Sequence, residues 1–164
     1  MERRTTSEWV KENEMDAYRY TECGLDNVFI EGMNPCIDDE GEEVYYIPNP
    51  VGLHKAIAAG IVAHPKGMSG KELRFLRTEI GLTQAELGRL VHRDAQTVAR
   101  WEKGITDIDS TAEAIIRKRA IEVLELEVEG ATMDAISERC VPSAEPQQIR
   151  ISGHDPAHYY PMAA

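Results

Sequence analysis

The sequence predicts an α+β protein that is mainly α-helical, with a small N-terminal β-hairpin or sheet and a short C-terminal extension. Apolar residues recur three or four positions apart through most of residues 51–126, which is the spacing of helices that face a core. Short runs of β-branched and aromatic residues separated by turn residues precede position 48. With 164 residues and 42% hydrophobic composition, the chain can bury a core without disulfide bonds.

The first 66 residues are expected to form an arm, a small sheet and one helix. Residues 1–16 are charged and lack apolar periodicity, so we predict a flexible arm there. Over 17–66 we predict a β-sheet plus helix region, in which the helix covers 51–63 and Pro48 and Pro50 end the sheet. Its three extended segments alternate in the manner of strands: 18–22, 27–31 and 43–47.

Residues 67–128 are predicted to form a helical domain, and its central part has the spacing of two short helices joined by a tight turn. Thr83 is followed three residues later by Glu86, which is the capping-box pattern at the start of a helix. Asp94 is placed to begin the second helix, over 94–103, and His92 and Arg93 lie in the turn between the two. A helix that follows such a turn can enter the DNA major groove.

At these residues the chain resembles the helix-turn-helix of the Cro/cI repressor family, also called the XRE family. The similarity covers roughly residues 68–126, and it implies a helix-turn-helix domain of that type in a DNA-binding transcriptional regulator. His92 departs from the family pattern, which has glycine there, and Arg93 stands where the family has an apolar residue. The matching segments are Leu82-Thr83-Gln84, Leu87, Thr97-Val98 and Arg100-Trp101-Glu102-Lys103-Gly104, with 72–77 and 112–126 resembling the flanking helices.

Four residues of the second helix are expected to contact bases. Glutamine can bond both polar atoms of an adenine edge, and arginine can do the same to guanine, so Gln96 and Arg100 are the principal candidates. Thr97 and Ala99 border the same face, where each can touch a thymine methyl group. The alternative for all four is an ordinary solvated helix face. Trp101 is predicted to be a core residue, because it lies three positions after Val98 on the inner face.

A second set of residues is expected to hold the DNA backbone. The resemblance assigns a phosphate contact to Gln84, at the beginning of its helix, where the helix dipole also favours anions. Arg77 and Lys71 are further candidates, and 117–119 form a basic run that can instead pair with Glu113 and Glu122. The other predicted phosphate contacts are Thr83, Arg74, Arg89 and Lys103.

The last helix of this domain is predicted from residue 110 to about 127, and Gly130 ends it. We expect its core positions to be Ile115, Ile116, Val123 and Leu124. The extension over 129–164 is expected to hold a short helix at 132–140 and a strand at 147–151.

Charge is distributed unevenly along the chain. The net charge is −11, yet residues 67–120 carry 10 Lys and Arg against 8 Asp and Glu. Residues 1–66 carry 6 against 13, and residues 121–164 carry 2 against 8. A local basic face can bind phosphate within a Debye length of roughly 8 Å even when the whole molecule is acidic. The acidic flanks favour a cationic partner and weaken non-specific DNA binding.

The remaining sequence features argue against enzymes, membrane proteins and metal sites. No run reaches the roughly 18 apolar residues of a membrane span, so we expect a cytoplasmic protein. No catalytic motif is present, so we predict no enzyme activity and no cofactor. Antitoxins of the MqsA type join a small zinc-binding domain to a helix-turn-helix of this family, and residues 20–24 are similar to a zinc-knuckle edge. The chain has no Cys-x-x-Cys, so we predict a non-zinc N-terminal region, although Cys23, Cys36, His54 and His64 are a conceivable ligand set.

These observations favour a sequence-specific DNA-binding regulator, expected to be a dimeric repressor on a double-stranded operator. The alternative is an antitoxin-like protein that binds a basic toxin through its acidic flanks and autoregulates its operon. A third possibility is a metabolite- or redox-sensing regulator that uses Cys23 or Cys36, because the three widely spaced cysteines indicate reduced thiols.

Overall fold

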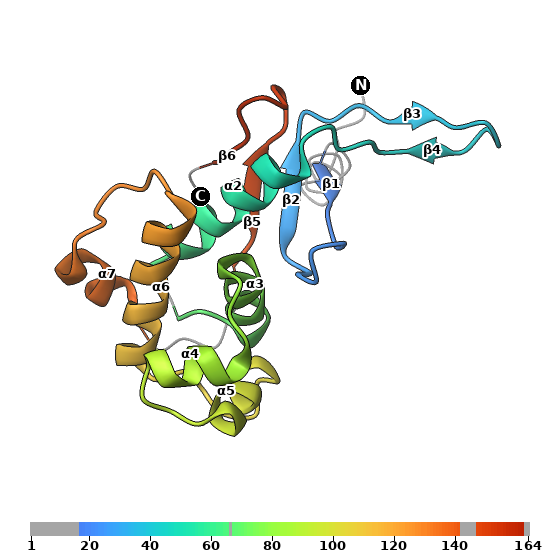
Figure 1. Cartoon of the computed structure of the whole chain (residues 1–164). Coiled ribbons are helices and arrows are strands. Elements are labelled where there is room, and N and C mark those ends of the chain that lie inside the picture. The colour runs from blue at the N-terminus through green and yellow to red at the C-terminus, as the bar shows by residue number, and fades with distance from the viewer. Residues whose placement is uncertain (1–16, 66, 142–146, 163–164) are drawn as a thin grey trace, which may run out of the picture.

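The computed structural model describes residues 17–65, 67–141 and 147–162, and within these ranges the protein is α+β and mainly helical, as predicted. The arm predicted at 1–16 lies outside the described residues. Each predicted helix is present, with bounds that differ by a few residues from the expectation (Figure 1). The helices are α2 (Pro50–Ala63), α3 (Gly70–Ile80), α4 (Gln84–Leu90), α5 (Ala95–Glu102), α6 (Ser110–Leu124) and α7 (Met133–Arg139).

The strands form one sheet of four and one hairpin of two. The strands are β1 (Ala17–Arg19), β2 (Val28–Glu31), β3 (Cys36–Ile37), β4 (Glu43–Val44), β5 (Ile149–Ser152) and β6 (Tyr160–Pro161). The sheet order is β1-β2-β5-β6, in which β2 and β5 are parallel and the other pairs are antiparallel. β3 and β4 pair only with each other, in a hairpin that extends away from the body (Figure 1).

The sheet therefore differs from the sequence-based expectation in its membership. The third predicted strand, 43–47, is reduced to β4 and lies outside the sheet, because its acidic residues and exposed Val44 have no apolar surface to cover. The C-terminal strand takes that place: Val28 pairs with Ile149 and Ile30 with Ile151, and all four side chains are buried.

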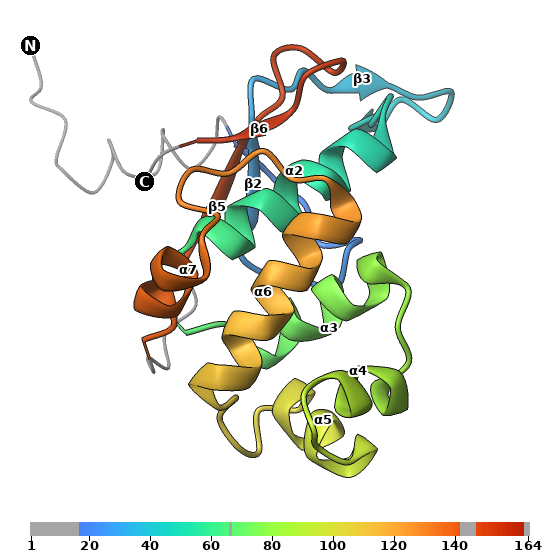
Figure 2. The ribbon, with the colours of Figure 1, turned by 60° about the vertical axis from the view of Figure 1, so that its left-hand side comes forward.

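α2 lies between the sheet and the remaining helices (Figure 2). It is buried on several sides, because it packs against β5 and β6 on one side and against α3 and α6 on the other. Asn49 begins it by accepting the Gly52 N–H at 3.0 Å, and Leu53, Ile57 and Ile61 are buried in the core. This helix joins the sheet to the helical part of the molecule.

α6 is anchored by a buried ion pair rather than by all of its predicted apolar positions. Arg117 is fully buried and bonds Glu113 at 2.7 Å, so this part of the basic run pairs internally. Arg117 also donates to the carbonyl of Val62, in the last turn of α2, at 3.0 Å and to that of His64, which follows the helix, at 2.6 Å. The ion pair thereby satisfies carbonyl groups that a helix end leaves without partners.

The end of α6 corrects two expectations. The helix ends at Leu124, one turn before the predicted residue 127, because Glu125 adopts a left-handed conformation with φ of 51°. Val123 was predicted to be in the core and is 41% exposed, whereas Ile116 is fully buried.

Candidate nucleic-acid interface

α4 and α5 begin at the predicted residues, each with a side chain that caps its first turn. Thr83 Oγ accepts the Glu86 N–H at 3.1 Å and the Glu86 carboxylate accepts the Thr83 N–H at 2.8 Å, which completes the capping box. Asp94 Oδ1 accepts the Thr97 N–H at 2.7 Å. The capping residues therefore fix where the two helices start and which way their faces point.

The turn between α4 and α5 holds a strained residue. His92 adopts φ of 56°, the left-handed region that glycine enters without strain. Close packing beside it requires Gly88, since a Cβ there would lie 2.5 Å from the Arg93 carbonyl oxygen. The Arg93 N–H donates to the Gly88 carbonyl at 2.8 Å. The turn is thus tight although no glycine occupies its left-handed position.

The structure also explains how an arginine is accommodated at position 93. The Arg93 guanidinium lies 3.1 Å from Asp109, the residue whose side chain caps α6. This position is exposed and an anion is within reach, so an arginine is accommodated here.

The inner faces of α4 and α5 form a shared core. Leu87 and Val98 are fully buried, and Val91 and Trp101 are 6% and 4% exposed. The prediction that Trp101 is a core anchor is confirmed. Leu90, at the end of α4, is 36% exposed, although its spacing from Leu87 is that of an inward-facing residue. Packing therefore fixes the angle between the helices and sets which side of α5 faces solvent.

The four predicted base contacts lie on that solvent side. Gln96 and Arg100 are exposed, and Thr97 and Ala99 are partly exposed. Apart from Thr97, which bonds the capping Asp94 carboxylate, none of the four side chains forms a hydrogen bond or ion pair with the described residues. The other three side chains are free to bond an external edge.

Several predicted phosphate contacts meet in one hollow between α3, α4 and α5. Its volume is about 190 Å³. Arg74, Gln84, Ala99 and Lys103 line it, together with Arg77 and Glu102. Residues distant in sequence thus converge on a concave, largely cationic surface. Thr83 lies beside it in sequence, whereas Arg89 is exposed on the last turn of α4 and does not line the hollow.

A network of ion pairs and hydrogen bonds forms one wall of the hollow. Glu102, 5% exposed, is bonded by Arg77 through both of its oxygens, and its Oε2 also accepts the Gln84 amide at 2.7 Å. The Arg77 guanidinium further donates to the Leu82 carbonyl at 2.9 Å. Arg77, a candidate phosphate contact by sequence, is therefore occupied internally. Gln84 retains its second amide hydrogen for an external acceptor.

Sequence reasoning missed this network because Glu102 was matched only as part of a motif. The signal that could have indicated it is an acidic residue in a segment otherwise rich in cations, at a helix end whose neighbours are buried. Lys71 is likewise occupied, since its ammonium lies 3.0 Å from the Asp26 carboxylate.

The cations of the protein divide into two groups. Within the described ranges, eight Lys and Arg side chains bond a carboxylate or a backbone carbonyl. Six form no hydrogen bond or ion pair there, and all six are exposed: Lys55, Arg74, Arg89, Arg100, Lys103 and Arg119. Four of these six belong to α3, α4, α5 or the residue that ends α5. Positive charge without an internal partner is therefore concentrated around the α4–α5 pair.

Two carboxylates near this surface are held ionised by local bonds. Hydrogen bonding from Thr97 lowers the pKa of Asp94 below its ordinary value of 3.8, and the charge of Arg100 adds to the effect. The Thr83 N–H and hydroxyl lower the pKa of Glu86 in the same way. Both anions serve the helix starts, so they reduce the positive field only next to the capped ends.

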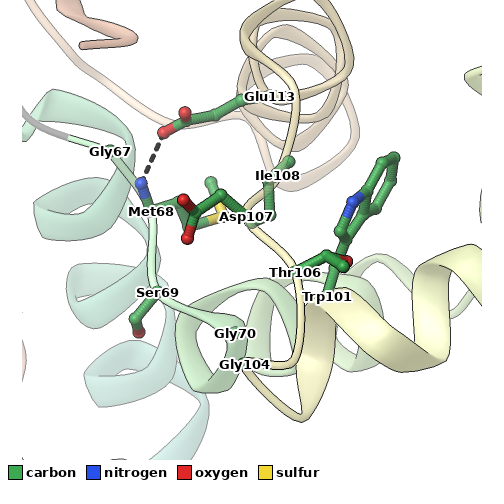
Figure 3. A pocket seen from close by; sticks show the side chains of 10 residues that line it. All are labelled: Gly67, Met68, Ser69, Gly70, Trp101, Gly104, Thr106, Asp107, Ile108 and Glu113. Carbon is green, nitrogen blue, oxygen red and sulfur yellow. Dashed lines mark hydrogen bonds between the residues drawn. The ribbon is translucent and has the colours of Figure 1, made fainter. Parts of the chain in front are cut away.

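A second hollow lies where the loop after α5 meets the start of α3 (Figure 3). In Figure 3 the Asp107 carboxylate reaches toward the segment of Met68 and Ser69, and the Met68 N–H is bonded to Glu113 at 2.7 Å. A Cβ on Gly70 would lie 2.3 Å from the Trp101 carbonyl oxygen, so α3 begins in direct contact with the end of α5. This contact fixes the C-terminal end of α5 on the body.

The N-terminal histidine of the conceivable zinc set takes part in a hydrogen-bonded chain. His54 bonds the Tyr20 hydroxyl and the Glu79 carboxylate, each at 2.9 Å, which links the segment after β1 to α2 and α3. Burial raises the pKa of Tyr20 to about 12. Among the described residues, no group of three or more His, Cys, Asp or Glu side chains has an arrangement that could hold a metal ion.

Cys23, Cys36 and Cys140 are free thiols. No helix in the described ranges is long and apolar enough to cross a membrane. Comparisons of the chain with protein families, with curated proteins and with solved structures found no match.

Proposed function

We propose that the protein is a sequence-specific DNA-binding transcriptional regulator that acts as a dimeric repressor. In this proposal α4 and α5 are a helix-turn-helix of the Cro/cI type, and α5 reads the major groove of an operator. The observation that carries the proposal is the gathering of exposed cations without internal partners around these two helices.

The charge argument is specific to this surface. Protein surfaces ordinarily intersperse both signs of charge, and eight cations of this chain do find partners. Arg74 and Lys103 instead share a hollow in which the only carboxylate, Glu102, is already bonded by Arg77 and Gln84. A phosphate group entering the hollow meets positive charge and at least one free amide hydrogen, which favours backbone contacts.

The geometry of α5 supports base reading by the same surface. Gln96, Ala99, Arg100 and Lys103 are spaced at i, i+3, i+4 and i+7, so they follow one face of the helix. An α-helix with its side chains is roughly 10–12 Å in diameter, which suits the roughly 12 Å width of the major groove, and the eight residues of α5 supply about 12 Å of helix length to lie in it. Arg100 and Gln96 then offer the donors and acceptors that recognise guanine and adenine.

Dimerisation follows from the size of the surface. One short helix reaches only a few base pairs, and such proteins gain affinity by placing two copies on half-sites about 34 Å apart. Light scattering of the free protein is expected to give twice the chain mass of 18.4 kDa, and the complex with operator DNA is expected to give the mass of two chains plus that of the DNA. A mass of one chain in both states would contradict the dimer.

The proposal is tested by separating base contacts from phosphate contacts. An operator is first selected from random-sequence DNA, and binding is then titrated on that operator and on unrelated DNA at two salt concentrations. Arg100→Ala is expected to cost about 1–3 kcal/mol on the operator and much less on unrelated DNA, and Gln96→Ala is expected to behave similarly. Arg74→Ala is expected to weaken both DNAs alike and to lower the salt slope by about one.

The matched control is Arg119→Ala, which removes an exposed cation without an internal partner from α6. It is expected to leave the salt slope and the operator affinity nearly unchanged. If it weakens binding as much as Arg74→Ala, total charge rather than the α4–α5 surface governs binding. If no variant changes binding, or no operator is selected, the DNA-binding proposal fails.

A further inference from the structure

The β3–β4 hairpin is the second exposed, highly charged part of the molecule, and DNA binding makes no use of it. It projects from the body at the end of the molecule opposite α4 and α5 (Figures 1 and 2). Five acidic residues lie within 36–44, and the chain has no Lys or Arg from Thr21 to His54. We call residues 36–46 the acidic hairpin.

The acidic hairpin is held in a defined shape by its own contacts. At its tip the Asp38 carboxylate accepts the N–H groups of Glu40 and Glu42, both at 2.9 Å, and Gly41 supplies a φ of 84°. At its base Tyr45 stacks on Tyr18, with ring centroids 4.3 Å apart. A surface that is fixed before binding loses less conformational entropy when a partner docks.

One face of the acidic hairpin carries apolar side chains that the protein leaves in solvent. Cys36 pairs with Val44, so these two side chains share a face, and Tyr46 lies in the segment that follows β4. Val44 is 39% and Tyr46 is 71% exposed. Tyr45, on the other face, packs on the body. The outward face therefore combines apolar area with a rim of carboxylates from Asp39, Glu40 and Glu42.

We propose that this outward face docks a cationic protein partner, one that presents Lys or Arg side chains around exposed aliphatic residues. Charge complementarity selects that class of occupant. DNA and anionic lipid surfaces would be repelled by the carboxylates, and a second acidic hairpin would bring like charges together. A cationic protein surface instead gains steering from the rim and burial of Val44 and Tyr46. The inference is independent of DNA binding.

The test uses the full chain and a defined probe, a synthetic peptide in which lysine and valine alternate, titrated by calorimetry at low and physiological salt. A twin peptide with glutamate in place of lysine, and one with serine in place of valine, separate the charge from the apolar contribution. We expect one lysine–valine peptide to bind per chain, with affinity that falls as salt rises. The two other peptides are expected to bind at least about tenfold more weakly.

Variants then locate the binding site. Asp39→Asn/Glu40→Gln/Glu42→Gln and Tyr46→Ser are each expected to weaken the lysine–valine peptide about tenfold or more, whereas Tyr46→Phe retains it. Tyr46 lies outside β4, so its replacement leaves strand pairing intact. The matched control, Glu127→Gln/Glu129→Gln/Glu138→Gln, removes the same charge from exposed sites elsewhere and is expected to bind normally.

Three outcomes would overturn the inference. The first is no binding of the lysine–valine peptide, and the second is an equal loss in the hairpin and control variants, which indicates bulk charge alone. The third is a change in oligomeric state of the hairpin variants in sedimentation, which would assign the face to a second copy of the chain. Operator affinity measured on the same variants distinguishes failure here from failure of DNA binding, because none of them lies near α4 or α5.

Discussion

The α4–α5 pair and the acidic hairpin both expose unpaired charge, of opposite sign and at opposite ends of the molecule (Figures 1 and 2). They differ in what supports that charge. The helix pair rests on a buried core that includes Leu87, Val98 and Trp101. The acidic hairpin has no such core, and among its apolar side chains Ile37 and Tyr46 are 66% and 71% exposed. The sign of the charge indicates which class of partner each surface can bind. Core packing determines how strongly a mutation in each region changes the free energy of unfolding.

The comparison is tested most severely by removing one aromatic side chain from each region. Trp101→Ala is expected to lower the free energy of unfolding by about 3–5 kcal/mol, because a buried side chain is lost and a cavity remains. Tyr46→Ala is expected to change it by less than about 0.5 kcal/mol, since the ring is already in solvent. Urea denaturation followed by circular dichroism measures both. Similar losses in the two variants would show that the acidic hairpin is part of the cooperative fold.

A second test compares the two turns, which use the left-handed conformation with different residues. Gly41→Ala is expected to cost roughly 1–2 kcal/mol, because alanine is strained at φ of 84°. His92→Gly is expected to stabilise the protein by about 0.5–1 kcal/mol, since relief of strain exceeds the added entropy of the unfolded chain. His92→Ala is the control: it keeps the strained conformation and is expected to give no gain. A loss of stability in His92→Gly would mean that the imidazole makes a stabilising contribution greater than its strain.

The smallest expected effect concerns pH and the cap of α5. The pKa of Asp94 is lowered in the folded state, so its contribution to stability is present above pH 3.8 and is lost as the pH falls through the folded-state pKa. Asp94→Asn keeps a good helix cap without the titrating group. It is expected to match the wild type near neutral pH and to lose less stability on acidification.

Urea denaturation across a pH series checks the Asp94 prediction. Glu86→Gln is the companion variant, because the pKa of Glu86 is lowered by its bonds to Thr83 in the capping box. In the double variant, the free energy of unfolding is expected to fall even less on acidification than in either single variant. An unchanged acid limb in both variants would assign the acid sensitivity to carboxylates outside the helix pair.

Local features were predictable from the sequence, and features that depend on distant partners were not. The starts of α4 and α5 at Thr83 and Asp94 follow from capping chemistry, and the burial of Trp101 follows from its spacing with Val98. The parallel pairing of β2 with β5 escaped prediction, because periodicity marks a strand without naming its neighbour.

The exposed residues of the candidate site were predicted from the sequence, whereas the ion pairs and hydrogen bonds among its side chains were not. The exposed positions of Gln96 and Arg100 follow from helix periodicity. The internal roles of Arg77 and Arg117 do not, because an arginine that bonds a distant carboxylate or helix end has the same local sequence signature as one that faces solvent. The sequence places His92 in a turn, yet only the structure shows that its backbone is left-handed and that the turn closes around it.

The pairing of β2 with β5 has a consequence for the order in which the protein can form during synthesis. Val28 must find Ile149, and all of the described helices lie between them in the chain. A ribosome therefore releases the helices before the sheet can be completed, and the apolar side chains of β2 lack their parallel partner throughout that interval. Contacts of such long sequence separation form slowly, which leaves β2 the segment most exposed to wrong pairing in the unfinished chain.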